Sequence, residues 1–92
     1  MHEASLMRSL MERIDRVLTE EGAARVVEVT VRLGALSHIS ADHFREHFAR
    51  AAEGGAAANA ALHVIPSDDP SAAFAQDVIL ESVVVESVAV ET

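Results

Sequence analysis

Residues 25–33 read RVVEVTVRL, and this stretch decides the fold. Apolar and polar side chains alternate along it. The apolar members are Val27, Val29, Val31 and Leu33, and the polar ones are Glu28, Thr30 and Arg32. A period of two is typical of a β-strand with one buried and one solvated face. The stretch therefore predicts a strand whose valine face is covered by other elements, and Gly34 ends it.

The segment before this strand has the periodicity of an amphipathic helix over residues 4–21. Apolar side chains recur there at steps of three and four residues, which places them on one face of a helix. These side chains are Leu6, Met7, Leu10, Met11, Ile14, Val17 and Leu18. Gly22 follows at the position where a left-handed residue commonly ends a helix, so we expect the helix to end there.

The segment after the strand predicts a second helix over residues 41–53. Ser40 is a favourable N-cap, and Asp42 in the first turn suits the positive end of the helix dipole. The expected apolar side of this helix consists of Phe44, Phe48, Ala51 and Ala52. The sequence EGG at 53–55 ends the helix.

Two further strands follow, separated by a loop. Residues 60–65 predict a strand with Leu62 and His63 on opposite faces. The Pro, Ser and Asp content of residues 66–76 predicts a loop. Residues 77–91 form a β-branched run so long that either a bulge breaks the strand or its end projects and pairs with another chain.

Together these elements predict a single domain over residues 1–92 with a two-layer α+β fold. The order is helix, strand, helix, strand, loop, strand, and both helices would cover one face of a three-stranded sheet. The chain has no cysteine, which excludes disulfides, Cys-based zinc sites and thiol nucleophiles.

The chain is strongly acidic, with 15 Asp and Glu against seven basic residues and a formal net charge of −8. Nucleic acids and anionic membranes bind clustered basic residues, so we expect neither as a partner. An acidic surface suits cations or a basic protein partner, and it equally keeps a small protein in solution. No apolar run reaches the ~20 residues of a membrane span, and no signal peptide is expected; we predict a cytoplasmic protein.

Catalytic motifs are not visible in the chain. It has no glycine-rich phosphate loop, and Ser5, Ser9 and Ser37 lack the surroundings of an activated nucleophile. We therefore predict that the protein is not an enzyme, and metal binding is the better candidate.

The N-terminal residues Met1, His2 and Glu3 have the chemistry of a metal chelate. The terminal amine, the backbone nitrogen of His2 and its imidazole can close two adjacent chelate rings, and Glu3 can supply a fourth donor. Planar, nitrogen-rich coordination suits Ni(II) or Cu(II), and it would weaken in acid because the amine and imidazole must lose protons. On spacing alone, an exposed terminal histidine without a ligand role is the more common case.

A secondary metal site is conceivable at three further histidines. His43 and His47 are four residues apart on the second predicted helix, so one face can present both imidazoles to one ion. His38 lies in the preceding loop. The alternative is that these histidines lie on a solvated flank of the helix and bind no metal. Without a known third ligand, this alternative is favoured.

Three stretches, in order, resemble the HypA/HybF family of nickel metallochaperones. They are Met-His-Glu-x-Ser-Leu at the start, a Gly-Ala-x-x-Val turn and a Gly-x-Leu-Ser stretch. The matching residues are Met1, His2, Glu3, Ser5, Leu6, Gly22, Ala23, Val26, Gly34, Leu36 and Ser37. EGGAAANAALHVIP and VILESVVVE are similar to the family's second and closing strands, so the resemblance covers nearly the whole chain.

The resemblance implies a mixed sheet with two helices and nickel delivery during maturation of NiFe hydrogenase, and sometimes of urease. It implies that His2 holds Ni(II) at the N-terminus and that Glu3 supports the site and a partner contact. The implied partners are a nickel-handling maturation GTPase and the large-subunit precursor of the hydrogenase. Whether the chain forms a homodimer stays open.

The chain departs from the family between its second and third strands. Family members insert there a zinc domain with two Cys-x-x-Cys pairs, whereas residues 66–76 form a short loop without cysteine. We therefore expect no structural zinc. His38, His43 and His47 are additions relative to the family motif. Two main functions stay open: a nickel chaperone, or a metal-independent adaptor that docks on a metalloenzyme precursor or maturation GTPase. A third and weaker alternative is copper or zinc handling through the additional histidines.

Overall fold

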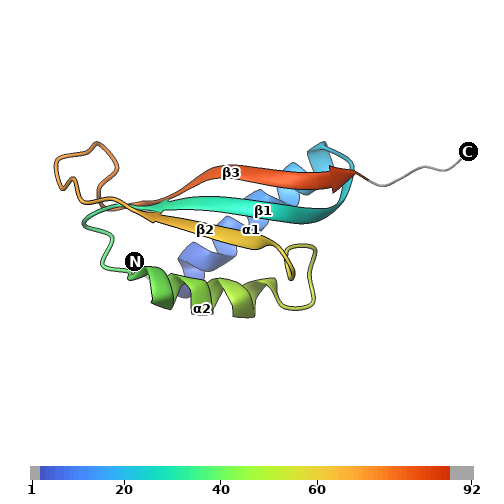
Figure 1. Ribbon diagram of the computed structural model, residues 1–92, viewed down its shortest axis with the longest axis horizontal. Helices are drawn as coiled ribbons and strands as arrows, with labels where there is room; N and C mark the ends of the chain where they lie inside the picture. Colours follow the sequence, from blue (N-terminus) through green and yellow to red (C-terminus); the bar gives the residue numbers. More distant parts are fainter. Residues whose placement is uncertain (1–2, 88–92) are drawn as a thin grey trace, which may run out of the picture.

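The computed structural model describes residues 3–87, and within them the predicted elements form in the predicted order (Figure 1). Their bounds are α1 Glu3–Glu20, β1 Ala23–Leu33, α2 Ala41–Ala52, β2 Ala61–Pro66 and β3 Val78–Ser87. The order of the strands in the sheet is β2-β1-β3. The stretch RVVEVTVRL is therefore the central strand, on which both other strands pair.

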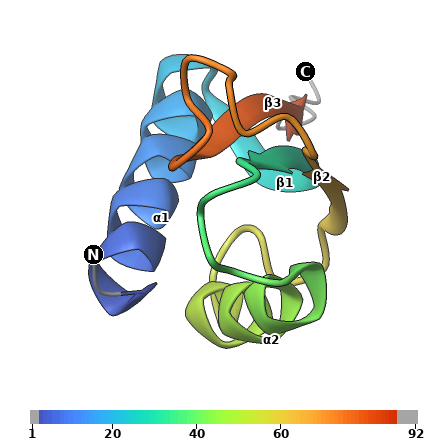
Figure 2. The ribbon, with the colours of Figure 1, turned by 90° about the vertical axis from the view of Figure 1, so that its left-hand side faces the viewer.

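The sheet is mixed, because β1 runs parallel to β2 and antiparallel to β3. A parallel pair needs a long crossover connection, and α2 supplies it between β1 and β2. Figure 2 shows α1 and α2 on the same side of the sheet. This arrangement confirms the predicted α+β fold with both helices on one face.

The core lies between this sheet face and the two helices. Its largest fully buried side chain is Phe44 of α2, which is 1% exposed, and Val29 and Val31 of β1 are fully covered. The buried cluster consists of Met7, Leu10, Ile14, Val26, Val29, Val31, Leu33, Phe44, Phe48, Ala52 and Ala57. Small aliphatic side chains from β1 thus fill the space beneath longer ones from the helices.

The alternation along β1 holds for Val29, Val31 and Leu33 but was wrong for Val27. The side chain of Val27 is 37% exposed, whereas that of Val26 is 3% exposed. The pairing of β1 with β3 shifts register between Val26 and Glu28. A bulge of this kind adds a residue to one strand, so the side chains before it change faces.

The end of α1 agrees with the prediction from Gly22, which has a φ of +60°. The amide of Gly22 donates a hydrogen bond of 3.2 Å to the carbonyl oxygen of Thr19. A left-handed residue with this bond closes the last turn of a helix. Within the described residues, neither α1 nor α2 is long and apolar enough to cross a membrane.

The start of α2 also agrees with the prediction, because Ser40 caps the helix. Its Oγ accepts a hydrogen bond of 3.1 Å from the backbone amide of His43. The expected apolar side needs one correction: Ala52 is buried, but Ala51 is exposed. The buried stripe of α2 runs through Phe44, Phe48 and Ala52 at steps of four residues, and Ala51 lies beside this stripe.

The first of the two alternatives for the last strand is confirmed, because bulges interrupt its pairing. Between the pairs Thr30↔Ser82 and Val31↔Leu80 the register shifts, which leaves Glu81 as the extra residue on β3. The expected projection of the strand end concerns residues 88–91, which lie outside the described residues.

The loop between β2 and β3 folds back over the turn that follows β1. The amide of Gly34 donates to the carbonyl oxygen of Asp77 at 2.9 Å, and that of Leu36 to the carbonyl oxygen of Ala75 at 2.7 Å. The amide of Ser67 donates to the carbonyl oxygen of Leu33 at 2.8 Å. These bonds fix the loop to the same end of the sheet from which the chain enters α2 (Figure 1).

Candidate metal centre

The predicted N-terminal chelate belongs to the start of α1. Met1, His2 and the side chain of Glu3 lie outside the described residues, and Glu3 is the first residue of α1. Further along, Met7, Leu10 and Ile14 are at most 6% exposed and fix this helix to the core. The helix that begins at Glu3 is therefore firmly packed on the core.

The first turns of α1 face α2 across a cavity of about 10 Å³. Its lining residues are Leu6, Met7, Ile39, His43, Phe44 and His47. Two candidate ligands, His43 and His47, thus lie beside the beginning of α1. The sequence did not predict this contact, because it depends on how α1 and α2 pack together.

The imidazoles of His43 and His47 contact each other. Their Nε2 atoms are 2.9 Å apart, the ring centroids are 4.6 Å apart, and the ring planes differ by 14°. The nitrogen edges are therefore closer than the ring centres, and both Nε2 atoms point to a common region. The i, i+4 spacing brings the two histidines together, as the sequence predicts.

His38 is not part of this pair. It adopts a φ of +60° in the connection between β1 and α2, and it lines a different, open cavity of about 490 Å³ with Leu36, Ser37, Gln76 and Asp77. Among the side chains that the structure describes, no group of three His, Asp or Glu could hold a metal ion. The structure thus brings together two of the three histidines of the proposed secondary site.

His63 lies on the solvated face of its strand, as predicted, and its side chain is 54% exposed. Its Nε2 lies 3.3 Å from Oε1 of Glu28 on the neighbouring strand β1. The sheet face that carries this pair is opposite to the helices, so His63 is remote from the start of α1.

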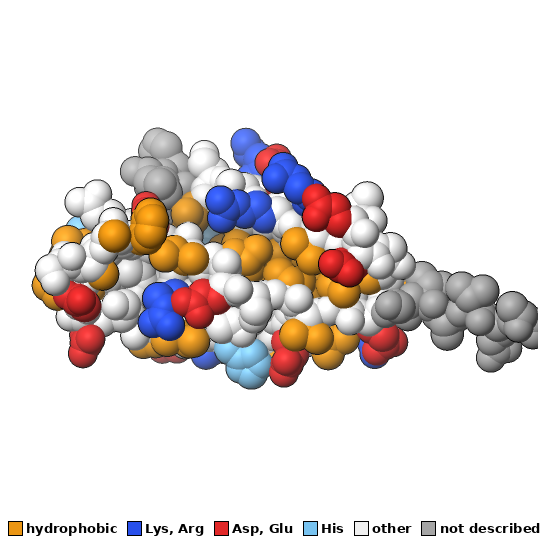
Figure 3. Space-filling model, turned by 90° about the horizontal axis from the view of Figure 1, so that it is seen from above, with side chains coloured by type: hydrophobic (Ala, Val, Ile, Leu, Met, Phe, Trp, Pro, Cys, Tyr) orange, Lys and Arg blue, Asp and Glu red, His pale blue; other side chains and the backbone are white. Residues whose placement is uncertain are grey.

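A shallow groove of about 390 Å³ runs between α1 and the beginning of β3. Its lining residues are Leu6, Ser9, Arg13, Phe74, Asp77, Val78 and Ile79. Phe74 is 62% exposed, and Figure 3 shows hydrophobic side chains between charged ones on this side of the molecule. Sequence reasoning missed this groove, and the one signal for it was a phenylalanine within a polar loop.

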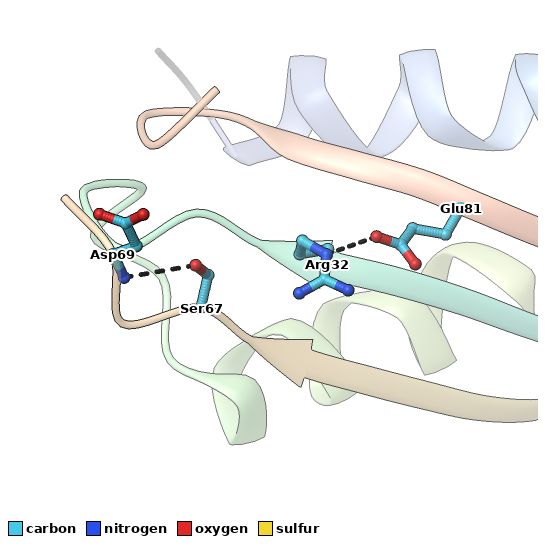
Figure 4. Close-up of polar contacts among 4 residues, drawn as sticks. All are labelled: Arg32, Ser67, Asp69 and Glu81. Atoms are coloured by element: carbon cyan, nitrogen blue, oxygen red, sulfur yellow. Dashed lines mark hydrogen bonds and ion pairs between the residues drawn. The ribbon is translucent and has the colours of Figure 1, made fainter. Parts of the chain in front are cut away.

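Charged and polar contacts on the solvated face of the sheet and in the loop between β2 and β3 stabilise the fold. Arg32 of β1 pairs with Glu81 of β3, and Ser67 Oγ accepts from the amide of Asp69 (Figure 4). Hydrogen bonds from Ser71 lower the pKa of the Asp69 carboxyl. These contacts tie β1 to β3 and hold the loop in shape.

Comparison with known proteins identifies the family. Residues 1–70 match the family described as "Hydrogenase/urease nickel incorporation, metallochaperone, hypA". The chain is 38% identical over 77 residues to the hydrogenase maturation factor HypA of Rhodopseudomonas palustris strain TIE-1, which covers 84% of this chain and 66% of that protein. It is 39% identical over 62 residues to HypA of Chloroflexus aggregans, covering 67% of this chain and 54% of the relative. The chain thus spans slightly less than two thirds, or about half, of the relatives it matches.

The fold is also that of a solved structure. The solution structure of the Ni metallochaperone HypA from Helicobacter pylori superimposes with a TM-score of 0.78, covering 95% of this chain and 99% of that chain. The sequence identity is 18%, so this similarity shows the fold. The family describes metallochaperones, which carry metal rather than catalyse a reaction, in agreement with the prediction that the protein is not an enzyme. From the match over residues 1–70 and from the relatives, the chain belongs to the HypA family of nickel-incorporation metallochaperones.

Proposed function

We propose that this protein binds Ni(II) at its N-terminus and delivers it during the maturation of NiFe hydrogenase. The proposed ligands are the amine of Met1, the backbone nitrogen and imidazole of His2, and Glu3. The observation that carries the proposal is the family match, which starts at residue 1 and so includes all three residues.

Glu3, the third of these residues, is the first residue of α1. Metal binding requires the amine, the amide and the imidazole to lose protons. The helix that begins at Glu3 is fixed to the core through Met7, Leu10 and Ile14.

Delivery requires a protein partner, which we propose to be the hydrogenase large-subunit precursor or a nickel-handling maturation GTPase. We further propose that the domain acts in the cytoplasm and without a structural zinc ion. The family match ends at residue 70, within the loop between β2 and β3, where the family's zinc domain would be inserted. The chain has no cysteine to hold such an ion.

A metal-independent adaptor is the second candidate function. It is supported by β3, which is an edge strand of the sheet, since an edge strand can accept a strand from another protein. The exposed Phe74 in the groove beside α1 offers a second contact for a partner.

The two functions differ in what His2→Ala does in cells that depend on this protein for hydrogenase maturation. The nickel chaperone predicts that His2→Ala reduces nickel in the hydrogenase large subunit to the level of cells without the protein. His63→Ala, which removes a histidine from the far sheet face, serves as the control and should behave as wild type. If His2→Ala matures the hydrogenase fully, the chaperone proposal is wrong and the adaptor function is favoured.

A further inference from the structure

We propose that His43 and His47 form a second site for a divalent transition-metal ion, separate from the N-terminal chelate. Its existence does not depend on the proposed function. Its role rests on that function, because the site would collect Ni(II) beside the start of α1, where we propose the tighter chelate.

The geometry of the pair already suits two ligands of one ion. Imidazole nitrogens bind such ions at ~2.0–2.1 Å, and two such bonds at a right angle place the nitrogens ~2.9 Å apart. The Nε2 atoms of His43 and His47 are 2.9 Å apart. An ion can therefore replace the proton shared between the rings without a change of the helix backbone.

The helix that carries the pair is held firmly. Phe44 and Phe48, each next to one of the histidines in sequence, are 1% and 4% exposed and pack in the core. Ser40 caps the same helix through the amide of His43. The two imidazoles are thus mounted on a turn whose backbone is fixed from its buried side and from its N-terminus.

The surroundings favour a cation of a particular class. The chain has a formal net charge of −8, and Asp42 and Glu46 are exposed on α2 next to the pair in sequence. Two imidazoles select Ni(II), Co(II), Cu(II) or Zn(II) over Mg²⁺ and Ca²⁺, which prefer oxygen ligands. The pair supplies two protein ligands, and water can complete the coordination, so the ion would exchange more readily than one held by a chelate with more donors.

The place of the site explains why it would matter. Leu6 and Met7 line the same cavity as the two histidines, and α1 begins at Glu3, about one turn earlier. One turn of an α-helix rises ~5.4 Å. An ion released from the pair would therefore be close to the start of α1.

The test is a Ni(II) titration by calorimetry of four proteins. They combine a terminus that begins at Met1, or one residue added before it, with wild-type histidines or with His43→Ala and His47→Ala together. Concentrations come from amino-acid analysis, because the chain has no Trp or Tyr. Circular dichroism checks that all four are folded, and His63→Ala is the matched control for loss of a histidine.

The proposal predicts two ions for the native protein, one weakly bound ion for the extended protein, one tightly bound ion for the double alanine variant, and none when both changes are combined. Paramagnetic broadening of the His43 and His47 ring resonances in the extended protein gives a readout without any alanine variant. If the extended protein binds no Ni(II), or binds it equally after His43→Ala and His47→Ala, the second site does not exist. If the double alanine variant that begins at Met1 binds no Ni(II) tightly, that result contradicts the N-terminal chelate instead.

Discussion

At the scale of single residues, Gly34 shows why the turn after β1 needs a residue without a side chain. A Cβ built on Gly34 would lie 2.2 Å from the carbonyl oxygen of Ala75, which belongs to the loop folded over this turn. Both partners are backbone, so neither can rotate away. Gly34 is therefore required by the close approach of two chain segments rather than by a positive φ.

Gly34→Ala should lower the free energy of unfolding by about 1–3 kcal/mol, because the added methyl group forces the loop away from the turn. Denaturation with urea, followed by circular dichroism, measures the change. Gly55→Ala is the matched control, since its Cβ would lie at an ordinary 3.4 Å from the nearest carbonyl oxygen. Equal effects of the two substitutions would show that the contact at Gly34 is not tight.

The site residues illustrate how far sequence reasoning reaches at this scale. The spacing of His43 and His47 was enough to predict that they meet, because it depends only on the geometry of one helix. Their place beside Leu6 and Met7 was not predictable, because it depends on how α1 and α2 pack together. The N-terminal ligands remain a prediction of the family motif.

At the scale of elements, α2 links the fold to the proposed second metal site. Its N-cap, Ser40, accepts a hydrogen bond from the amide of His43, so the cap also fixes the turn that carries the imidazole pair. The side of this helix next to α1 carries the pair, with His43 exposed and His47 half-buried, and the buried side carries Phe44 and Phe48. The same element therefore serves stability and metal binding.

Ser40→Ala should destabilise the protein by about 1 kcal/mol, because one amide at the start of α2 loses its partner. For a domain of this size the melting temperature should fall by roughly 4–8 °C. Ser9→Ala, an exposed position within α1, is the control and should change the melting temperature little. A melting temperature unchanged by Ser40→Ala would mean that water replaces the cap without loss.

The pairing of β1 with β3 predicts a small pH dependence. Arg25 donates to Oε2 of Glu86 at 2.9 Å, and this bond, together with the attraction of the charges, lowers the pKa of Glu86 below its ordinary 4.5. A carboxyl whose folded pKa is lowered stabilises the fold above its unfolded pKa. That contribution is lost as the pH falls through the folded pKa.

Wild type should therefore be slightly more stable than Glu86→Gln at pH 7, and the difference should vanish as the pH falls through the lowered pKa of Glu86. Both side chains are more than half exposed, so 1 M salt should also reduce the difference. Urea denaturation across this pH range measures it. A difference that persists in acid would assign the effect to side-chain packing instead of to the charge.

The pairing of β1 with β3 also explains the one buried position of β1 that the sequence predicted wrongly. The alternation in RVVEVTVRL predicted the strand and most of its buried face, since period-two patterns report burial directly. Val27 was assigned to the wrong face because a bulge belongs to the pairing of two strands and leaves no clear mark on either sequence.

At the scale of the whole molecule, the order of elements and the two-layer fold followed from periodicity and turn residues. The groove between α1 and β3 did not, because Ser9 and Phe74 meet there from opposite ends of the chain. The result is a domain of the HypA family with a histidine pair and a shallow groove on either side of the same helix, α1. The central claim is that the N-terminus of this helix holds nickel.

The most direct test of that claim is the absorption spectrum of Ni(II) added to protein that begins at Met1, to His2→Ala, and to protein with one residue added before Met1. A chelate made of the Met1 amine and His2 predicts the absorption of a planar, low-spin Ni(II) ion in the first protein alone. The His43 and His47 pair, with water as further ligand, would not give this absorption. The same planar spectrum in all three proteins, or its absence from the first, would contradict the account.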